Sequence, residues 1–442
     1  MSYTPKDFID LGYPFEKWML EAVEIAKLEG DEADLQKIAD EVKAMPQFKA
    51  HKMRTEPCET YINLDDGNEY EHANKLQAVD TINRLALLPT IEKAAVMPDA
   101  CSAGAICVGG VVAARNAIHP AFHSADVCCS MFMSEIECDN PNRALDYACE
   151  VTHFGPIQRV DAVEMPAHLE ALILSNVYTK DLLHYAKRDF ATQGDGNHFL
   201  FVGKRKSTGN TTIVTHHGSR GFGAKLFKRG MKIAQDFAKT IAPRGMDKQC
   251  AWIPMETQEG RDYWEALQIV REWTYENHKV IHDMILQRGS YRLIDRFWNE
   301  HNFVFRRDDL YYHAKGATPG WPDSYDFTLV PMNMAEPILI TRGTEVANGI
   351  GFLPHGAGRN MSRTKFKALN PSPSLPEGID IRSYSGALDA TELPQAYKSA
   401  AEVKAQMKSY GLAEVVDEIT PYGCIMAGEI EEPWRKKKKQ IE

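Results

Sequence analysis

Five short segments of the chain concentrate side chains that bind metal ions or phosphate. They span residues 123–131, 194–199, 215–223, 300–303 and 354–363. Their cysteine, aspartate and histidine side chains form a donor set of intermediate softness, which suits manganese, iron, cobalt or zinc. Glycine-rich turns that lead into helices expose backbone N–H groups to phosphate, and Arg220 and Arg359 add fork-shaped donors. Together these features indicate phosphoryl or nucleotidyl transfer at a metal centre.

Each segment taken alone also has a structural interpretation. A single loop histidine is usually a surface group or a satisfied core side chain, and Cys128 and Cys129 alone are typical of core packing. A lone Gly-x-Gly is a weak signal for phosphate. Because the segments are spread over about half of the chain, only their co-occurrence favours a metal site, and both interpretations stay open at this point.

The composition is that of a globular protein with a large core. The chain has 442 residues, of which 44% are hydrophobic and 25% charged. A net charge of −10 argues against binding nucleic acid through bulk positive charge, although local basic segments occur at residues 204–206, 225–232 and 363–367. The nine cysteines match no disulfide scaffold, and we find neither a signal-peptide pattern nor a membrane-spanning apolar run. We therefore expect a reducing, cytoplasmic compartment.

Short β-rich runs and helical patterns alternate along most of the chain, which predicts an α+β fold with mixed sheets flanked by helices. Residues 15–27 and 35–42 are amphipathic, with Asp31 as the expected cap of the second segment. Strands are expected at 105–114, 131–136, 199–203, 211–215 and 338–341, and helices at 223–241, 263–286 and 396–410. We expect a helical N-terminal extension over 1–75, one large domain over 76–430 and a basic tail over 431–442, with a rigid loop at 370–378.

The chemical segments, read in order, resemble the RtcB family of RNA-splicing ligases. The matching motifs are Met97-Pro-Asp99, Asp126-Val-Cys-Cys129, Gly196-Asn197-His198-Phe199, His216-x-Gly-Ser-Arg220-Gly, His301-Asn302, Lys315-Gly-Ala and His355-Gly-Ala-Gly-Arg359-x-Met-Ser-Arg363. The last motif is long and specific, and the resemblance extends from about residue 90 to residue 428. It implies one large RtcB-like domain with a central metal cleft.

The resemblance also implies an activity and a role for each matching residue. In that family a GTP-dependent enzyme joins an RNA 2′,3′-cyclic phosphate or 3′-phosphate end to a 5′-hydroxyl end, with two Mn²⁺ ions and a histidine–GMP intermediate, in RNA repair or tRNA splicing. His355 would be the nucleophile. The metal ligands would be Asp126, Cys129, His198, His216 and His301, with Cys129 bridging. Nucleotide binding would involve Asn197, Arg220, Asn333, His355, Gly356, Gly358, Arg359 and Tyr397, with the tyrosine packed on the guanine.

Several positions depart from the family pattern. Cys128 and Ser130 replace the glycines on either side of the ligand cysteine, and Phe201 replaces a glutamate. The positions expected to read guanine differ at Phe201, Asn333 and Ala427, so the sequence leaves the nucleotide preference open. Two alternatives therefore remain, a metal-dependent RNA-end phosphoesterase and a non-catalytic RNA-end-binding protein. The metal, the natural RNA, an accessory activator, the oligomeric state and the role of the N-terminal extension are also left open.

Overall fold

The computed structural model describes residues 3–429, except for 14, 17, 45–49, 66–68, 156–157, 345–346 and 371–373. The predicted basic tail and part of the predicted 370–378 loop lie outside the described residues. The chain divides into two compact units, Met1–His51 with Thr240–Ala242, and Lys52–Lys239 with Pro243–Glu442. Among the described residues, no helix combines the length and apolarity that a membrane crossing requires.

The described part of the first unit is built on helices α1 (Pro5–Asp10), α2 (Trp18–Glu29) and α3 (Leu35–Ala44). They enclose a small apolar core that includes Phe8 and Trp18. Asp34, not the expected Asp31, caps α3, because its carboxylate accepts a hydrogen bond from the Lys37 backbone N–H at 3.1 Å. The predicted extension ran to residue 75, but β1 (Glu59–Ile62) and α4 (Glu69–Leu85) belong to the second unit.

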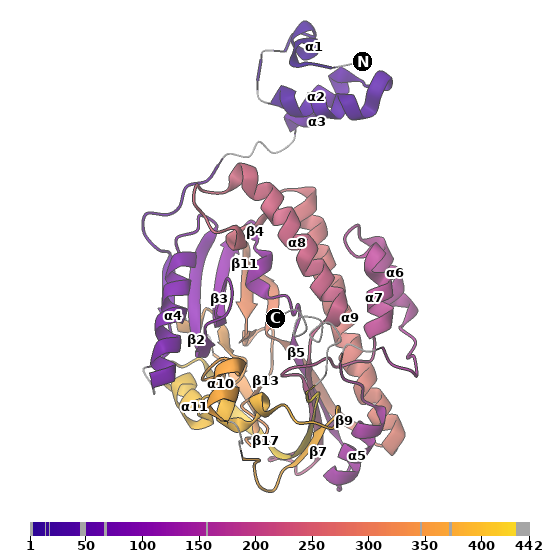
Figure 1. The fold of residues 1–442 in the computed structure, drawn as a ribbon, viewed down its shortest axis with the longest axis vertical. Helices are drawn as coiled ribbons and strands as arrows, with labels where there is room; N and C mark the ends of the chain where they lie inside the picture. The colour runs from indigo at the N-terminus through magenta and orange to yellow at the C-terminus, as the bar shows by residue number, and fades with distance from the viewer. Residues whose placement is uncertain are drawn as a thin grey trace. The chain divides into compact units, whose positions relative to one another are not determined.

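The second unit contains a five-stranded sheet in the order β1-β2-β3-β11-β10. Its further strands are β2 (Ile91–Cys101), β3 (Val108–Arg115), β11 (Leu310–Lys315) and β10 (Asn302–Arg307). β1 runs parallel to β2, and the other pairs are antiparallel. Helix α4 packs against β2 (Figure 1).

The strand ends of an eight-stranded sheet adjoin the predicted metal ligands, of which His216 lies within a strand. Its order is β13-β14-β17-β6-β7-β5-β9, and β16 pairs in parallel with β17. The strands are β13 (Thr328–Pro331), β14 (Ile338–Gly343), β17 (Ala413–Met426), β6 (Phe199–Arg205), β7 (Thr211–His217), β5 (Ser130–Ile136), β9 (Leu293–Glu300) and β16 (Asp380–Ser383). Two short pairs complete the strands, β12 (Ala317–Pro319) with β15 (Phe352–Pro354) and β4 (Ala117–Ile118) with β8 (Ile253–Pro254).

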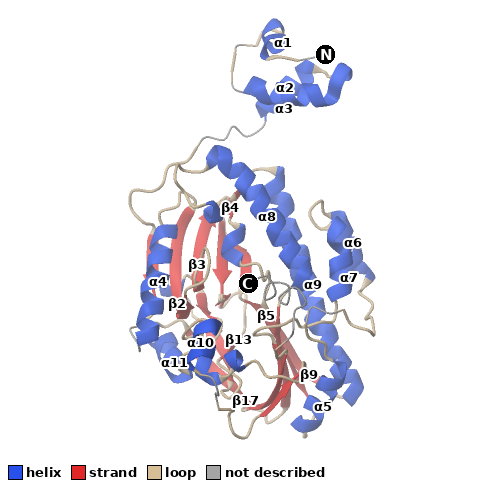
Figure 2. Cartoon of the chain, viewed as in Figure 1, coloured by secondary structure: helices blue, strands red, loops and turns tan. Residues whose placement is uncertain are grey.

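Helices flank the strands of the second unit, as Figure 2 shows. They are α5 (Pro141–Val151), α6 (Ala167–Ser175), α7 (Leu183–Asp189), α8 (Arg220–Ile241), α9 (Gln258–Gly289), α10 (Arg363–Leu369) and α11 (Ala400–Ser409). Thr257 caps α9, and the buried Leu267, Val270, Trp273 and Ile281 form its core face at helical spacing. The predicted α+β fold with mixed sheets is confirmed.

Candidate metal centre and adjoining cavity

The ends of neighbouring strands bring the predicted metal ligands together. Ser130 at the start of β5 pairs with His217 of β7 and with Glu300 of β9. Cys129 therefore lies next to the strand ends that carry His216 and His301, and its carbonyl accepts the His301 backbone N–H at 2.9 Å. Backbone pairing between three strands thus fixes residues that lie far apart in the sequence.

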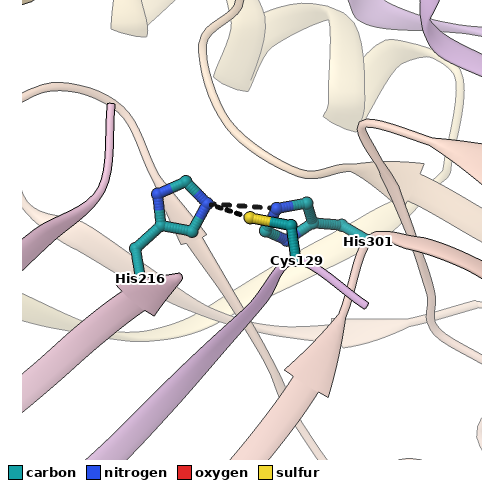
Figure 3. Close-up of side chains that lie close together, drawn as sticks. All are labelled: Cys129, His216 and His301. Carbon is teal, nitrogen blue, oxygen red and sulfur yellow. Dashed lines mark hydrogen bonds between the residues drawn. The ribbon is translucent and has the colours of Figure 1, made fainter. Parts of the chain in front are cut away.

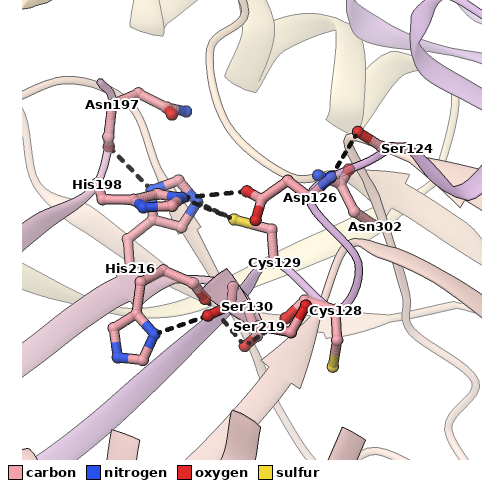
Figure 4. A network of polar contacts seen from close by, with 12 residues as sticks. Ser124, Asp126, Cys128, Cys129, Ser130, Asn197, His198, His216, Ser219 and Asn302 are labelled. Carbon is pink, nitrogen blue, oxygen red and sulfur yellow. Dashed lines mark hydrogen bonds and ion pairs between the residues drawn. The ribbon is translucent and has the colours of Figure 1, made fainter. Parts of the chain in front are cut away.

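The ligand atoms form two groups that share Cys129. In one group, drawn in Figure 3, His216 Nε2 lies 3.2 Å from Cys129 Sγ and 3.1 Å from His301 Nε2. In the other group, drawn in Figure 4, His198 Nε2 lies 3.6 Å from Cys129 Sγ and 3.1 Å from Asp126 Oδ2. Within each group the ligand atoms all lie within 4.8 Å of one another. The arrangement can hold two cations with the cysteine sulfur between them.

The hydrogen-bond pattern around these atoms fits a cation. The His216 ring faces the Asn197 carbonyl with Nδ1 at 3.1 Å, which places the ring proton on Nδ1 and a lone pair on Nε2. That lone pair points at the Cys129 sulfur and at His301 Nε2. A cation placed between these atoms would accept lone pairs from both rings and from the sulfur together. The donor set of imidazole, thiolate and carboxylate suits the metals predicted from the sequence.

The surroundings hold the histidine and aspartate ligands in the protonation states that bind metal, and keep the cysteine protonated. Burial, with the charges of His198 and His355, lowers the pKa of His216 to about 3, so its ring is neutral at pH 7. Burial alone would raise the pKa of Asp126, but the charge and hydrogen bond of His198 outweigh it and lower this pKa to about 2. Burial raises the pKa of the Cys129 thiol, and only a bound cation would remove its proton.

Cys128 differs from its neighbour in both position and backbone. Its φ is 60°, in the left-handed region that favours glycine. Its side chain is fully buried in the main apolar core, and Figure 4 shows its sulfur turned away from the ligand group. The loop therefore keeps a glycine-like conformation without a glycine, and only Cys129 faces the other ligands.

His355 lies beside the metal centre and is held by a buried carboxylate. Its Nδ1 is 2.6 Å from Asp99 Oδ2, and Asp99 on β2 is fully buried. The Nδ1–H therefore donates to the carboxylate, which leaves the lone pair on Nε2. The centroids of the His355 and His301 rings are 4.8 Å apart. This geometry orients Nε2 of the His355 ring next to the ligand atoms.

A glycine allows the loop of His355 to approach β2. Gly358 has a φ of +73°, and a Cβ added there would lie 2.0 Å from the Asp99 carbonyl oxygen. Any side chain at this position would push the loop away from the strand that carries Asp99. Gly358 thus keeps the His355–Asp99 pair together.

A cavity of about 250 Å³ opens beside His355. The predicted nucleotide-binding residues that line it are Asn197, Asn333, His355, Gly356, Gly358, Arg359 and Tyr397. Arg220 is not among its lining residues. A Cβ on Gly194 would lie 2.1 Å from Arg220 Nη1 and 2.6 Å from His198 Nδ1, so the guanidinium lies at the edge of the metal centre.

A buried carboxylate organises one side of the cavity. Glu392, which is 2% exposed, accepts hydrogen bonds from Arg363 Nε at 2.9 Å and from the Tyr397 hydroxyl. Arg359 Nη1 lies 3.6 Å from Glu392 and donates to the Thr391 carbonyl at 2.8 Å, and its guanidinium lies 5.4 Å from the Tyr397 ring. Arg359 Nη2 is buried and has no partner among the described residues, so it can still donate to a bound anion.

Another part of the cavity lining is apolar. Its side chains come from β6, from β17 and from the loop between β13 and β14, and they include Phe199, Phe201, Met332, Met334, Cys424 and Met426. Phe201 occupies a position where the sequence departs from the family pattern. The cavity therefore combines a polar side next to His355 with an apolar side.

The predicted basic segments are partly engaged within the protein. Arg205 binds the carboxylates of Glu135 and Asp417 at 2.7 and 2.8 Å, and Arg229 binds Asp181. Burial raises the pKa of Glu135, but hydrogen bonds from neighbours, Arg205 among them, outweigh it, and the pKa stays below its ordinary value. These arginines therefore stabilise the fold and are poor candidates for RNA contacts.

Sequence reasoning gave no role to two residues of this site. Asp99 belongs to a matching motif, but its partner His355 is 256 residues away, so no local pattern connects them. Glu392 stands outside every motif, and no sequence signal distinguishes it from a surface acid. Its importance comes from the two arginines and the tyrosine that surround it.

Comparisons with known proteins show which family the chain resembles. The family model described as tRNA-splicing ligase RtcB matches residues 143–427. The chain is 27% identical over 280 residues to the tRNA-splicing ligase RtcB of Methanocaldococcus jannaschii, which covers 52% of this chain and 29% of that protein. It is 28% identical over 295 residues to the same-named protein of Archaeoglobus fulgidus, which covers 56% of this chain and 61% of that protein. The chain thus spans less than two thirds of the length of each of these two relatives. Because the family model covers well over half of the chain, the chain belongs to the RtcB family.

Proposed function

We propose that the chain is an RNA ligase that joins a 2′,3′-cyclic phosphate or 3′-phosphate RNA end to a 5′-hydroxyl end. GTP supplies a GMP group to His355, and two Mn²⁺ ions take part, in RNA repair or tRNA splicing. One observation carries the proposal: His355, anchored by Asp99 at 2.6 Å, stands between the metal-ligand cluster and the cavity. The names of the similar proteins support RNA ligation as the outcome.

The first step transfers GMP to the histidine. His355 Nε2 forms a bond with the α-phosphorus of GTP, the bond from that phosphorus to its bridging oxygen breaks, and pyrophosphate leaves with the electron pair. The Nδ1 proton stays on the ring, which becomes cationic. The Asp99 carboxylate, fully buried beside Nδ1, stabilises this charge.

The next steps transfer GMP to RNA and close the strand. A 3′-phosphate oxygen attacks the phosphorus of the adduct, and His355 leaves as a neutral ring. The RNA 5′-hydroxyl then attacks the activated 3′-phosphorus and loses its proton to solvent, and GMP departs. A cyclic phosphate end first adds water to become a 3′-phosphate. Arg359, with its unpaired Nη2, can bind a phosphate oxygen during these steps.

The residues that would hold the two ions are Asp126, Cys129, His198, His216 and His301, with Cys129 shared. When bound, the ions would neutralise the phosphate oxygens and so favour attack by a neutral nucleophile. The proposal assigns this chemistry to the second unit and gives α1–α3 no chemical role.

Incubation with GTP labelled at the α-phosphate, in the presence of Mn²⁺, tests the adduct directly. We expect an acid-labile label on the protein in a denaturing gel. His355→Ala should remove the label, and His184→Ala, a control at an exposed histidine on α7, should keep it. Unlabelled RNA with a 3′-phosphate and a 5′-hydroxyl end should then discharge the label and yield a joined product.

Three outcomes would contradict the proposal and separate the alternatives. If neither GTP nor ATP labels the protein, the nucleotidyl mechanism is wrong. If cyclic phosphate ends open without any nucleotide, the chain is a phosphoesterase. If the protein binds RNA ends but takes up no Mn²⁺, it is a non-catalytic binding protein.

A further inference from the structure

The sheet that carries the metal ligands continues directly into the apolar side of the cavity. His216 of β7 pairs with Phe199 of β6, and Phe199 pairs with Met426 of β17. Directly paired residues point to the same face of a sheet, so these side chains form one row. Neighbouring strands are about 4.8 Å apart, so the apolar side begins about 5 Å from a metal ligand and extends to about 10 Å.

A second row lies beside the first on the same face. Phe201 of β6 pairs with Cys424 of β17, and both side chains are almost fully buried. Met334, from the loop between β13 and β14, packs in one cluster with Cys424 and Met426. A flat ring that enters this part of the cavity meets carbon and sulfur atoms on the sheet side.

The apolar side is within reach of the base of a nucleotide attached at His355, whereas the resemblance implied a base packed on Tyr397, which lies beside Glu392. The reacting α-phosphate lies at His355, next to the ligand cluster, and the ribose separates it from the base. The opposite side of the cavity offers arginines beside Glu392, whose guanidinium groups suit phosphate oxygens. The apolar side is therefore the part of the cavity that matches a nucleobase.

Among the described residues, the apolar side of the cavity carries no carboxylate that could distinguish one purine from the other. Guanine differs from adenine in its two adjacent N–H donors, which a carboxylate would accept. Among the described cavity residues the carboxylate is Glu392, and it already accepts from Arg363 and Tyr397. Asn333 Oδ1 accepts the Ala335 backbone N–H at 3.0 Å, which leaves its amide group as a donor. Both purines offer acceptors to a single donor.

We propose that Phe199, Phe201, Met334, Cys424 and Met426 form a base-binding subsite that holds a purine by stacking and van der Waals contact without reading its edge. The chain then uses adenosine and guanosine triphosphates about equally well. This inference rests on the proposed function, because it assigns the base of the nucleotide that His355 receives. A site that pairs with polar groups of a substrate rejects the wrong substrate by about 10⁴-fold or more, and an apolar site does not.

The test compares the two purine nucleotides in binding and in labelling. Isothermal titration calorimetry with GMP and AMP should give dissociation constants within about tenfold of each other, and labelling by α-labelled GTP and ATP should agree within the same factor. A preference for either purine above tenfold in both measurements overturns the subsite while the proposed function stands. If neither nucleotide binds or labels, the proposed function fails as well.

A matched pair of variants tests the residues of the subsite. Phe201→Leu should weaken GMP and AMP binding by the same factor, about three- to tenfold, because it removes aromatic contact area from both. Phe327→Leu changes a half-buried aromatic residue of the same apolar cluster as Phe201, outside the cavity lining, and should leave both constants unchanged. Unequal losses for the two purines in Phe201→Leu, or equal effects of the two variants, would contradict the assignment.

Discussion

Replacing Asp99 with asparagine removes one charge from the group 2.6 Å from His355 Nδ1 and keeps its size. The Asp99 side chain is fully buried, and its Oδ1 has no partner among the described residues. The amide can therefore turn either way. If its oxygen faces His355, the hydrogen bond persists without the charge. If its NH₂ faces His355, the ring proton moves to Nε2 and the nucleophilic lone pair is lost.

The two orientations set the lower and upper limits of the effect. A hydrogen bond to a charged group contributes about 1.5–3 kcal/mol and a neutral one about 0.5–1.5 kcal/mol, so losing the charge costs about 1.4 kcal/mol, or tenfold in rate. Forcing the wrong ring tautomer costs about 10⁴-fold in a serine-protease histidine–aspartate pair. We expect Asp99→Asn to slow adduct formation by at least about tenfold.

Single-turnover labelling with α-labelled GTP measures this rate, and manganese content and GMP affinity are measured on the same samples. Both should stay at the wild-type level, because Asp99 is neither a predicted ligand nor a base contact. Asp417→Asn, which removes a half-buried carboxylate from the Arg205 ion pairs, is the matched control and should label normally. An unchanged rate in Asp99→Asn would refute the orienting role. Loss of metal together with label would show that the effect passes through the metal centre.

Three further predictions rest on matched pairs or on pH. Cys129→Ala should abolish manganese binding and Cys128→Ala should not, since of these two cysteines only Cys129 has its sulfur among the ligand atoms. If elemental analysis shows equal losses of bound manganese in the two variants, the two cysteines are wrongly assigned. Gly358 and Gly378 have φ values of +73° and +74°, but of these two glycines only Gly358 has backbone within 4 Å of an added Cβ. Gly358→Ala should therefore slow labelling at least about tenfold. Gly378→Ala should cost about 1–2 kcal/mol of stability and leave labelling intact. Despite burial, hydrogen bonds keep the pKa of Glu135 below its ordinary value, so the stability that this carboxylate contributes is complete above about pH 4.3 and is lost as the pH falls through the folded-state pKa. The difference in melting temperature between wild type and Glu135→Gln should be several degrees at pH 7 and should narrow toward pH 3. A difference that stays constant with pH would contradict this.

Local patterns were sufficient to predict the strands that carry the site. Apolar runs at 131–136, 199–203 and 211–215, bounded by turn residues, correspond to β5, β6 and β7. The predicted ligands lie at or near the ends of these strands, and the structure brings them together. The ends of neighbouring strands meet at one edge of a sheet, which is why separate motifs can form one centre.

Features that depend on distant partners were not predictable in the same way. No strand was expected at β17 (Ala413–Met426), because three acidic residues, Glu414, Asp417 and Glu418, interrupt its apolar pattern. In addition, Pro421 lies at a shift in the register between β17 and β6. Asp417 is tolerated there because Arg205 of the neighbouring strand binds its carboxylate. Pairing between strands supplied the missing information, and no window of local sequence contains it.

The metal centre and the apolar subsite share the β6–β7 pair but depend on different positions of it. His216 is fixed by its pairing with Phe199 and by its hydrogen bond to the Asn197 carbonyl. Phe201 pairs with Val214 and Cys424, one step further along the same strands. A side-chain exchange at Phe201 changes the surface that a base would contact and leaves the backbone that positions His216 unchanged. Base selectivity and metal binding can therefore vary independently in this fold, so a Phe201→Leu protein should keep its full manganese content while its nucleotide affinity falls.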